Sequence, residues 1–138
     1  RYGMVLPNFA AQALAGEPIT VYGTGQQSRC FGHVNDAVEA LLRLVANPAT
    51  IGQVYNVGND EEVTIHRLAE LVREAAGSSS EIRLIPYSEA YAEGFEDMLR
   101  RVPDVRKLER TIGFRPSTPL SQIIADVVAD QRARLAAR

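Results

Sequence analysis

A tyrosine and an arginine on either side of a glycine-containing segment are the residues best suited to hold a ligand. Tyr22 precedes Gly23-Thr24-Gly25, and Arg29 lies just beyond it. A guanidinium can clamp phosphate oxygens through paired hydrogen bonds, and a tyrosine ring can pack against a nucleobase. Composition alone favours a structural interpretation instead, in which Arg29 pairs with a surface carboxylate and Tyr22 fills the core.

Motifs for catalysis, metal binding or cofactor binding are missing from the sequence. Gly23-Thr24-Gly25 is only a G-x-G followed by Gln-Gln-Ser, so no G-x-G-x-x-G joins a strand to a helix. There is also no G-x-x-x-x-G-K-[ST], H-E-x-x-H or G-x-S-x-G motif. His33 and His66 are isolated, with no second metal-type ligand at helical spacing. We therefore expect no catalytic, cofactor-binding or metal-binding residue in this chain.

Length and charge narrow the class of protein. The 138 residues suffice for one domain with its own core. A net charge of −2, from 15 basic and 17 acidic residues, gives little support to nucleic-acid binding. The single Cys30 indicates a reducing compartment. No apolar run approaches the roughly 18 residues of a membrane span, so we expect a cytoplasmic protein without a membrane or nucleic-acid partner.

The first half of the sequence predicts two helices and three short strands. Residues 4–15 form a helix with proline near its start and glycine after its end. A second helix, capped by Asn35, is predicted from apolar residues at helical spacing, which are Val38, Leu41, Leu42 and Val45. Strands are expected where β-branched and aromatic residues gather, at 19–22, 29–34 and 53–57.

The second half predicts three more helices and a strand. Thr64 is the expected N-cap of a helix that ends at Gly77. A strand at 82–85 leads into residues 86–103, which have no clean period and are predicted to be a long, partly irregular loop. Asp104 is expected to cap a short helix.

The last predicted helix opens at Thr118-Pro119 and carries an apolar stripe over residues 120–128. We place that stripe in the core together with Val38, Leu41 and Leu68. The fold class is therefore α/β: a small mixed domain with short strands and about five helices, without a regular βαβ series.

Residues 9–36 read FAAQALAGEPITVYGTGQQSRCFGHVND. They resemble the F-x-x-Q-A-L-x-G-x-P-L-T-V-Y-G-x-G-x-Q-x-R-x-F-x-x-V-x-D pattern of the extended short-chain dehydrogenase/reductases, the NAD-dependent nucleotide-sugar epimerases, dehydratases and decarboxylases. Three further pieces follow in the family's order, at 54–58, at the helix opened by Thr64, and at 101–104 with 112–116. The likeness covers nearly the whole chain and is strongest to UDP-glucuronate decarboxylases and UDP-glucose 4-epimerase-like proteins.

By this resemblance the chain supplies the sugar-nucleotide pocket. Arg29 would contact the diphosphate, and Arg101 would be a second phosphate partner, with Arg100 an equally good candidate. Asn56 corresponds to the asparagine of the family's Y-N-x-G strand, and Asp97 lies in the loop where relatives place a polar group near the ribose. The full set of implied substrate-binding residues is Val5, Leu6, Thr20, Val21, Tyr22, Arg29, Asn56, Asp97 and Arg101.

The resemblance also implies an enzyme whose other half is absent. In the family, hydride transfer uses a glycine-rich turn that binds NAD and a Tyr-x-x-x-Lys pair as acid and base, and the sequence contains neither. NAD would therefore be bound by the missing N-terminal Rossmann part of the parent enzyme. Residues 1–138 would form the C-terminal, nucleotide-sugar-binding domain and are not expected to be active alone. Arg1-Tyr2-Gly3 leads directly into helix-like sequence, which indicates a cut within a longer protein.

Three functions remain open at this point. The favoured one is binding of the UDP part of a nucleotide sugar, as the substrate-binding half of an epimerase, decarboxylase or dehydratase. The alternatives are a stand-alone truncated binding or regulatory module without catalysis, and a docking domain without a ligand. Because a surface that should meet the missing half would be exposed, we also expect a homo-oligomer.

Overall fold

The computed structural model describes residues 4–90 and 98–137, which form two compact units. Unit 1 comprises Arg1–Ser28, Val63–Arg100 and Ile124–Arg138. Unit 2 comprises Arg29–Glu62 and Arg101–Ile123. Each unit thus gathers segments that are far apart in the sequence.

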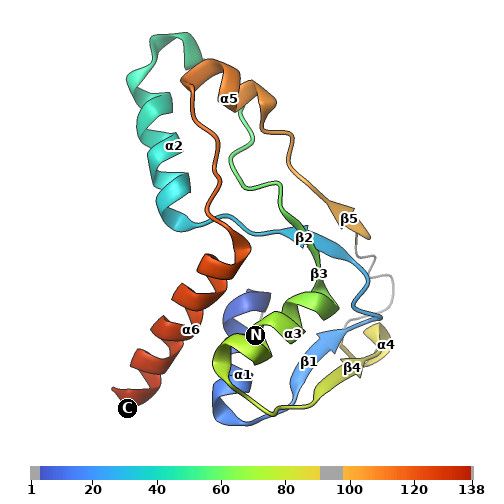
Figure 1. Ribbon diagram of the computed structural model, residues 1–138. Coiled ribbons are helices and arrows are strands. Elements are labelled where there is room, and N and C mark those ends of the chain that lie inside the picture. The colour runs from blue at the N-terminus through green and yellow to red at the C-terminus, as the bar shows by residue number, and fades with distance from the viewer. Residues whose placement is uncertain (1–3, 91–97, 138) are drawn as a thin grey trace. The chain divides into compact units, whose positions relative to one another are not determined.

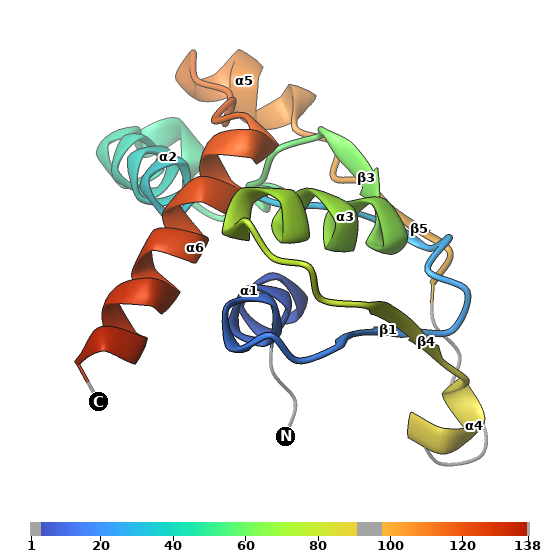
Figure 2. The ribbon, with the colours of Figure 1, turned by 60° about the horizontal axis from the view of Figure 1, so that its bottom comes forward.

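Unit 1 is built around two helices and a pair of parallel strands. Helix α1 (Val5–Ala15) packs against α3 (Ile65–Ala76), and both contact β1 (Ile19–Tyr22). Strand β1 pairs in parallel with β4 (Ile82–Ile85), as Figures 1 and 2 show. All four elements confirm the sequence prediction. The short helix α4 (Tyr87–Ala90) follows β4.

Caps at both ends explain why α3 forms where the sequence predicted it. The hydroxyl of Thr64 accepts a hydrogen bond from the Arg67 backbone N–H at 3.1 Å, which satisfies one of the free N–H groups of the first turn. At the other end Gly77 adopts a left-handed conformation with a φ of 64°, which glycine reaches without a steric penalty. The predicted boundaries of this helix are confirmed.

The core of unit 1 lies between these elements. The side chains of Ile19 and Val21 in β1 are fully buried, as are Leu68 and Val72 in α3. Because strand side chains alternate between two faces, Thr20 and Tyr22 lie on the other face of β1. The prediction that Leu68 belongs to the core is therefore confirmed.

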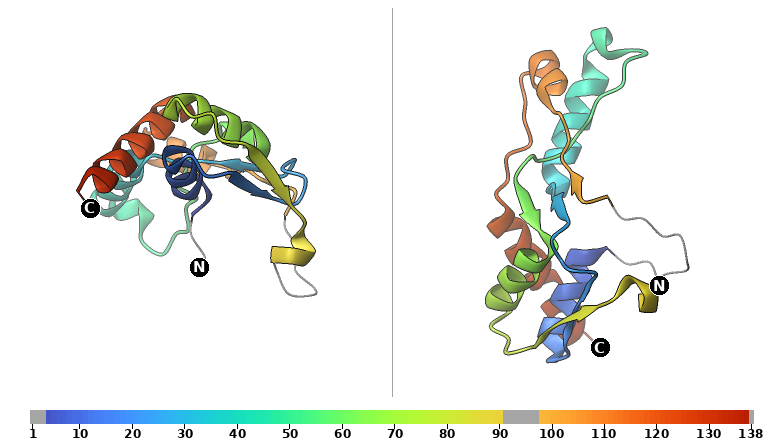
Figure 3. Two further views of the ribbon diagram at one scale, coloured as in Figure 1. Left: turned by 90° about the horizontal axis from the view of Figure 1, so that it is seen from below. Right: turned by 90° about the vertical axis from the view of Figure 1, so that its right-hand side faces the viewer.

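Unit 2 is built around α2 (Val34–Ala46) and α5 (Arg106–Ile112), which contact each other. The two helices lie side by side in Figure 1 and in the right-hand view of Figure 3. A short 3-10 helix, η1 (Pro48–Thr50), follows α2. Ala40, Val105 and Leu108 are buried here, so the helix pair has a small core of its own.

The boundaries between the two units fall within three short strands and the last helix. The strands form a sheet in the order β3 (Glu62–Thr64), β2 (Ser28–Cys30), β5 (Arg100–Arg101). Helix α6 (Leu120–Ala136) is longer than the predicted stripe. Its buried residues confirm the stripe as core, and they are Leu120, Ile123, Ile124 and Val128. No helix in the described ranges is long and apolar enough to cross a membrane.

Two predictions about α2 are wrong. The helix begins at Val34, and its cap is His33, whose Nδ1 accepts a hydrogen bond from the Asn35 N–H at 3.1 Å. Val38 and Leu41, expected in the core, are 48% and 55% exposed. The spacing identified an apolar stripe correctly, but α2 has apolar residues on a second side as well. That second side, which includes Ala40, is the one that the fold buries.

Two predicted strands also differ from the structure. The strand expected at 29–34 ends at Cys30, because helix α2 begins four residues later. Residues 53–57, predicted as a strand, belong to no strand or helix. A strand requires a hydrogen-bonded neighbour, and the part of the chain that the structure describes places none beside this segment.

Candidate functional site

Tyr22 ends β1 at an exposed position. Its side chain is 41% exposed, whereas the neighbouring Val21 is fully buried. The side-chain amide of Gln27, itself buried, donates a hydrogen bond to the Tyr22 carbonyl oxygen at 3.0 Å. This bond connects the end of β1 to the residue just before β2. It therefore restricts the backbone that carries the Tyr22 ring.

Gly23 and Gly25 shape the turn between these two residues. Both have a positive φ, of 70° and 73°, which favours glycine. A Cβ atom on Gly23 would collide with the ring of Tyr87. A Cβ atom on Gly25 would lie 2.9 Å from the His66 Cβ atom. Protein side chains therefore fill the space beside both glycines.

This turn does not fit the pyrophosphate of NAD. A dinucleotide-binding turn joins a strand to a helix N-terminus and uses glycine to leave room for phosphate. Here the turn joins strand β1 to strand β2, and Tyr87 and His66 occupy the space that its glycines leave. We assign no step through NAD to the described residues of this chain.

The four predicted residues on α1 and β1 differ in what they can offer a ligand. The Gln12 side chain donates to the Thr20 hydroxyl at 2.9 Å and accepts from the Thr20 N–H at 3.1 Å, which ties α1 to β1. Val5 and Thr20 are half-buried, whereas the side chains of Leu6 and Val21 are buried. Leu6 and Val21 therefore hold α1 and β1 in place from within the core.

Arg29 and Arg101 lie on neighbouring strands. Strand β2 carries Arg29, β5 ends at Arg101, and the two strands are adjacent in the sheet. Both residues belong to unit 2, where Arg29 is half-buried and Arg101 exposed. Adjacent strands are about 4.8 Å apart, so the two arginines belong to neighbouring segments of one sheet.

The segment that carries Asn56 is attached to the region around α5. The Asn56 side chain donates to the Asp104 carbonyl oxygen at 3.2 Å. The Lys107 ammonium group donates to the Val54 carbonyl oxygen at 3.0 Å and lies 4.6 Å from the centre of the Tyr55 ring. Asn56 itself is exposed, and its amide nitrogen serves to anchor the segment.

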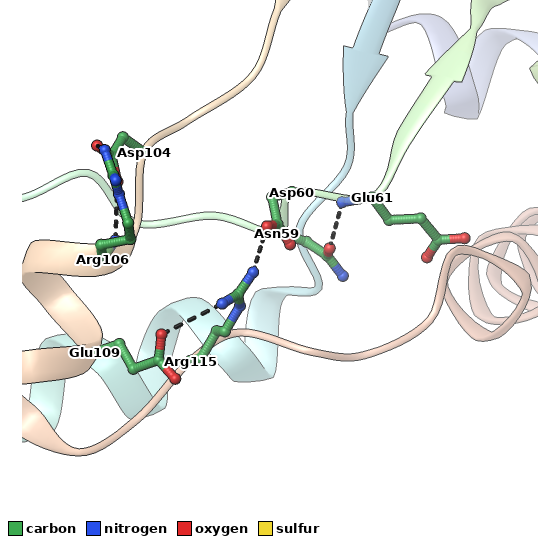
Figure 4. A network of polar contacts seen from close by, with 7 residues as sticks. All are labelled: Asn59, Asp60, Glu61, Asp104, Arg106, Glu109 and Arg115. Atoms are coloured by element: carbon green, nitrogen blue, oxygen red, sulfur yellow. Dashed lines mark hydrogen bonds and ion pairs between the residues drawn. The ribbon is translucent and has the colours of Figure 1, made fainter.

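A polar network in unit 2 holds the residues that follow Asn56 (Figure 4). The Arg115 guanidinium pairs with Asp60 and, at 3.3 Å, with Glu109 in the first turn of α5. The buried Asn59 accepts from the Glu61 N–H at 2.8 Å and donates to the Thr118 carbonyl oxygen at 2.8 Å. Side chains of the 59–61 segment are therefore fastened both to α5 and to the chain that leads into α6.

Two carboxylates complete this attachment. Asp36 accepts hydrogen bonds from the backbone N–H groups of Ser117 and Thr118, at 3.2 and 2.9 Å. Glu61 accepts from the Leu120 N–H at 2.8 Å, in the first turn of α6. Both satisfy N–H groups that a turn or a helix start leaves unpaired. Side chains that bond to distant backbone thus connect several segments of unit 2.

Asp104 acts just before α5. Its carboxylate accepts hydrogen bonds from the Arg106 side chain, at 2.6 and 2.9 Å, and from the Arg106 backbone N–H at 3.0 Å. These bonds from Arg106 hold the pKa of the Asp104 carboxyl well below its usual range. The helix begins at Arg106 and its N-cap is Val105, so the prediction of Asp104 as the cap is wrong by one residue. Asp104 nevertheless accepts a hydrogen bond from the first N–H of the helix.

The predicted site residues are divided between the units. Val5, Leu6 and residues 20–22 belong to unit 1, whereas Arg29, Asn56 and Arg101 belong to unit 2. That Tyr22 and Arg29 contact one ligand stays a prediction. Asp97 lies outside the described residues.

Sequence reasoning missed two residues at the turn. It did not single out Gln27, which secures the Tyr22 backbone, or Tyr87, whose ring lies against Gly23. The paired glycines were the available signal, because a G-x-G outside a phosphate-binding motif indicates close packing by another part of the chain.

Known proteins resemble this chain in sequence. Residues 1–58 match the sequence model of the NAD dependent epimerase/dehydratase family. The chain is 35% identical over 127 residues to UDP-N-acetyl-alpha-D-glucosaminuronate decarboxylase of Bacillus cytotoxicus, a match that covers 92% of this chain and 39% of the relative. It is 40% identical over 120 residues to UDP-glucuronic acid decarboxylase 1 of Danio rerio, covering 87% and 27%.

A solved structure agrees with these matches. UDP-glucose 4-epimerase of Thermotoga maritima, determined with UDP-glucose, aligns with a TM-score of 0.81 at 26% identity and covers 97% of this chain. Together these matches support a place for the chain among the NAD-dependent epimerase/dehydratase family of extended short-chain dehydrogenase/reductases. Its relatives are nucleotide-sugar decarboxylases and epimerases, and it spans 39% of the length of the Bacillus relative and 41% of the Thermotoga chain.

Proposed function

We propose that the chain binds the diphosphate and base of a UDP-sugar, as the substrate-binding part of an NAD-dependent nucleotide-sugar decarboxylase, epimerase or dehydratase. The placement of Arg29 and Arg101 on adjacent strands of unit 2 is the observation that carries the proposal. Charge-assisted bonds from two guanidinium groups suit a diphosphate better than a single phosphate. The Thermotoga relative, which was determined with UDP-glucose, supports this ligand class.

Tyr22 is the proposed partner of the base. Its ring is partly exposed at the end of β1, and its backbone is fixed by Gln27. An exposed tyrosine on a rigid backbone can cover one face of a pyrimidine with little loss of conformational freedom on binding. Val5 and Thr20 retain accessible surface and are proposed to border the base, with Asn56 and Asp97 as further polar contacts.

The contribution of this chain to a reaction would be positional. By anchoring the UDP end, it would bring the sugar to reacting groups supplied by the part of the family fold outside this chain. Binding energy from the remote nucleotide would then serve the chemistry at the sugar. Which sugar is used, and which of the three reactions follows, depends on that other part.

Calorimetric titration with UDP tests the phosphate site. Arg29→Ala and Arg101→Ala are each expected to weaken binding about 10- to 100-fold, since a hydrogen bond to a charged group contributes about 1.5–3 kcal/mol. Arg29→Lys should have an intermediate effect, because it keeps the charge and loses the paired geometry. Arg110→Ala is the matched control, because Arg110 is an exposed arginine of α5 and belongs to neither strand.

A second series tests the base. Tyr22→Phe should retain affinity and Tyr22→Ala should lose it, because the ring face rather than the hydroxyl is proposed to act. Unchanged affinity in Arg29→Ala would disprove the diphosphate contact. If no heat of UDP binding is detected, a docking domain without a ligand becomes the better interpretation.

A further inference from the structure

The side chain of Gln12 occupies one edge of strand β1. Its amide oxygen accepts a hydrogen bond from the Thr20 backbone N–H at 3.1 Å, and its amide nitrogen donates to the Thr20 hydroxyl at 2.9 Å. The N–H groups of Ile19 and Gly23 bond to carbonyl groups in and next to β4, so the Thr20 N–H between them points to the opposite edge. Gln12 therefore satisfies a donor that the two-stranded sheet leaves unpaired.

This pair of bonds determines what the Thr20 hydroxyl can still offer a ligand. A threonine hydroxyl has one proton to donate and two lone pairs. One lone pair accepts from Gln12, and no group in the described part of the chain accepts the proton. Thr20 is half-buried, so a ligand that covers it would exclude water from that proton, and an O–H group without an acceptor is costly. The hydroxyl therefore favours a ligand atom that accepts a hydrogen bond.

The neighbours of Thr20 favour the same kind of ligand atom. Its partner in the register of β1 and β4 is Arg83, whose guanidinium has donors only. The Glu81 carboxylate is paired with that guanidinium at 3.0 Å. Tyr22 lies two residues beyond Thr20 on the same face of β1, about 7 Å along the strand, so a base against the Tyr22 ring would have an edge toward Thr20.

We propose that Gln12 is a specificity-determining residue, which holds the Thr20 hydroxyl as a hydrogen-bond donor and thereby selects uracil over cytosine. Uracil carries a carbonyl oxygen at C4, which accepts, whereas cytosine carries an amino group there, which donates. Cytosine would therefore bring one donor against another. Stacking on Tyr22 cannot make this distinction, because every base has a π-face. The inference rests on the proposed function and adds the group that distinguishes one pyrimidine from the other.

Titration with UDP and with CDP tests the proposal, because these ligands share the ribose and the diphosphate and differ only in the base. The unaltered chain is expected to bind UDP about 5- to 10-fold more tightly than CDP. Gln12→Glu should abolish or reverse this preference, because a carboxylate accepts from both the N–H and the hydroxyl of Thr20 and so uses the proton. The ratio of the two affinities is the measurement, since any repulsion between the new charge and the diphosphate affects both ligands equally.

Three further variants show whether the hydroxyl itself is responsible. Thr20→Val removes the hydroxyl at nearly the same shape and should make the two affinities nearly equal. Thr20→Ser keeps the hydroxyl and should restore the preference for UDP. Gln122→Glu is the matched control, because it adds the same charge at an exposed position of α6 and should leave the ratio unchanged. Thermal unfolding of each variant verifies that the ratio is measured on folded protein.

The outcomes separate this inference from the proposed function. A preference for UDP that Gln12→Glu removes and Gln122→Glu retains supports the role of Gln12. Equal affinities for UDP and CDP in the unaltered chain, or an unchanged preference in Gln12→Glu, would overturn it and leave the diphosphate contact of Arg29 intact. If neither ligand binds, the proposed function fails and the inference fails with it.

Discussion

The side-chain amide of Gln27 bonds to the carbonyl oxygen of Tyr22 and thereby closes the turn between β1 and β2. The amide is buried, so its bond is not exchanged with water. The turn is short and glycine-containing, and such a bond restricts it more than it would restrict a regular element.

Replacing Gln27 should loosen the turn. Gln27→Ala is expected to lower the free energy of unfolding by about 1–3 kcal/mol, because the Tyr22 carbonyl loses its buried partner. Gln26 is exposed, and Gln26→Ala should change stability by less than about 0.5 kcal/mol. Urea unfolding of both variants measures the difference, and equal effects would contradict a specific role for Gln27.

Gly25 and Gly52 form a matched pair for testing packing at the turn. Their φ angles are nearly the same, 73° and 72°, but a Cβ atom at Gly52 would meet nothing within 4 Å. Alanine at either site should cost roughly 1–2 kcal/mol in backbone strain. Gly25→Ala should cost about 1–3 kcal/mol more, because its methyl group would press against His66. Thermal unfolding that gave equal losses would show that the crowding is relieved.

Asp36 should be important for the stability of unit 2. Its carboxylate accepts from two backbone N–H groups, at Ser117 and Thr118. Asp36→Ala is expected to destabilise the unit by about 1–3 kcal/mol. Asp36→Asn retains an acceptor oxygen and should recover part of the loss. Amide exchange of residues 117–123 is the measurement, and identical exchange in both variants would argue against these bonds.

Acid should weaken unit 2 through Asp104. The Arg106 side chain lowers the pKa of this carboxyl in the folded protein, so the folded state favours the ionised form. The stabilisation is therefore present above the ordinary aspartate pKa of 3.8 and is lost as the pH falls below it.

The variant Asp104→Asn tests that pH dependence. It should lose less stability than the unaltered chain between about pH 5 and about pH 3, because the group that titrates is gone. Arg106→Gln should give a similarly flattened profile, since it removes the partner instead. The stability of the unaltered chain and of both variants is measured by urea unfolding at each pH. Parallel curves of stability against pH would show that the pair has no effect.

The sequence predicted local elements best where a cap or glycine marks an end. Thr64 and Gly77 bound α3 as expected, because these signals act within a few residues. The segment at 53–57 could not be settled in this way, since strand formation depends on a neighbour that its own sequence does not encode. The same limit applies to α2. Spacing placed Leu41 on an apolar stripe, but it could not show which side of the helix would be covered.

Prediction of the candidate site was limited in a similar way, because residue types can be read from the sequence and tertiary contacts cannot. Tyr22 and Arg29 were singled out as candidates because ring and guanidinium chemistry can be read from residue type. Tyr87 was missed, because its approach to Gly23 joins positions distant in sequence. Packing of that kind depends on tertiary structure, and the spacing of residues within a motif does not predict it.

The division of the chain into interleaved units also has consequences for synthesis. The chain crosses between the units four times, after residues 28, 62, 100 and 123. During translation neither unit can be completed from an uninterrupted stretch, and unit 1 must wait for residues from Ile124 onward. Partly made chains would therefore expose unfinished surfaces on the ribosome, and chaperones would be expected to occupy them until α6 emerges.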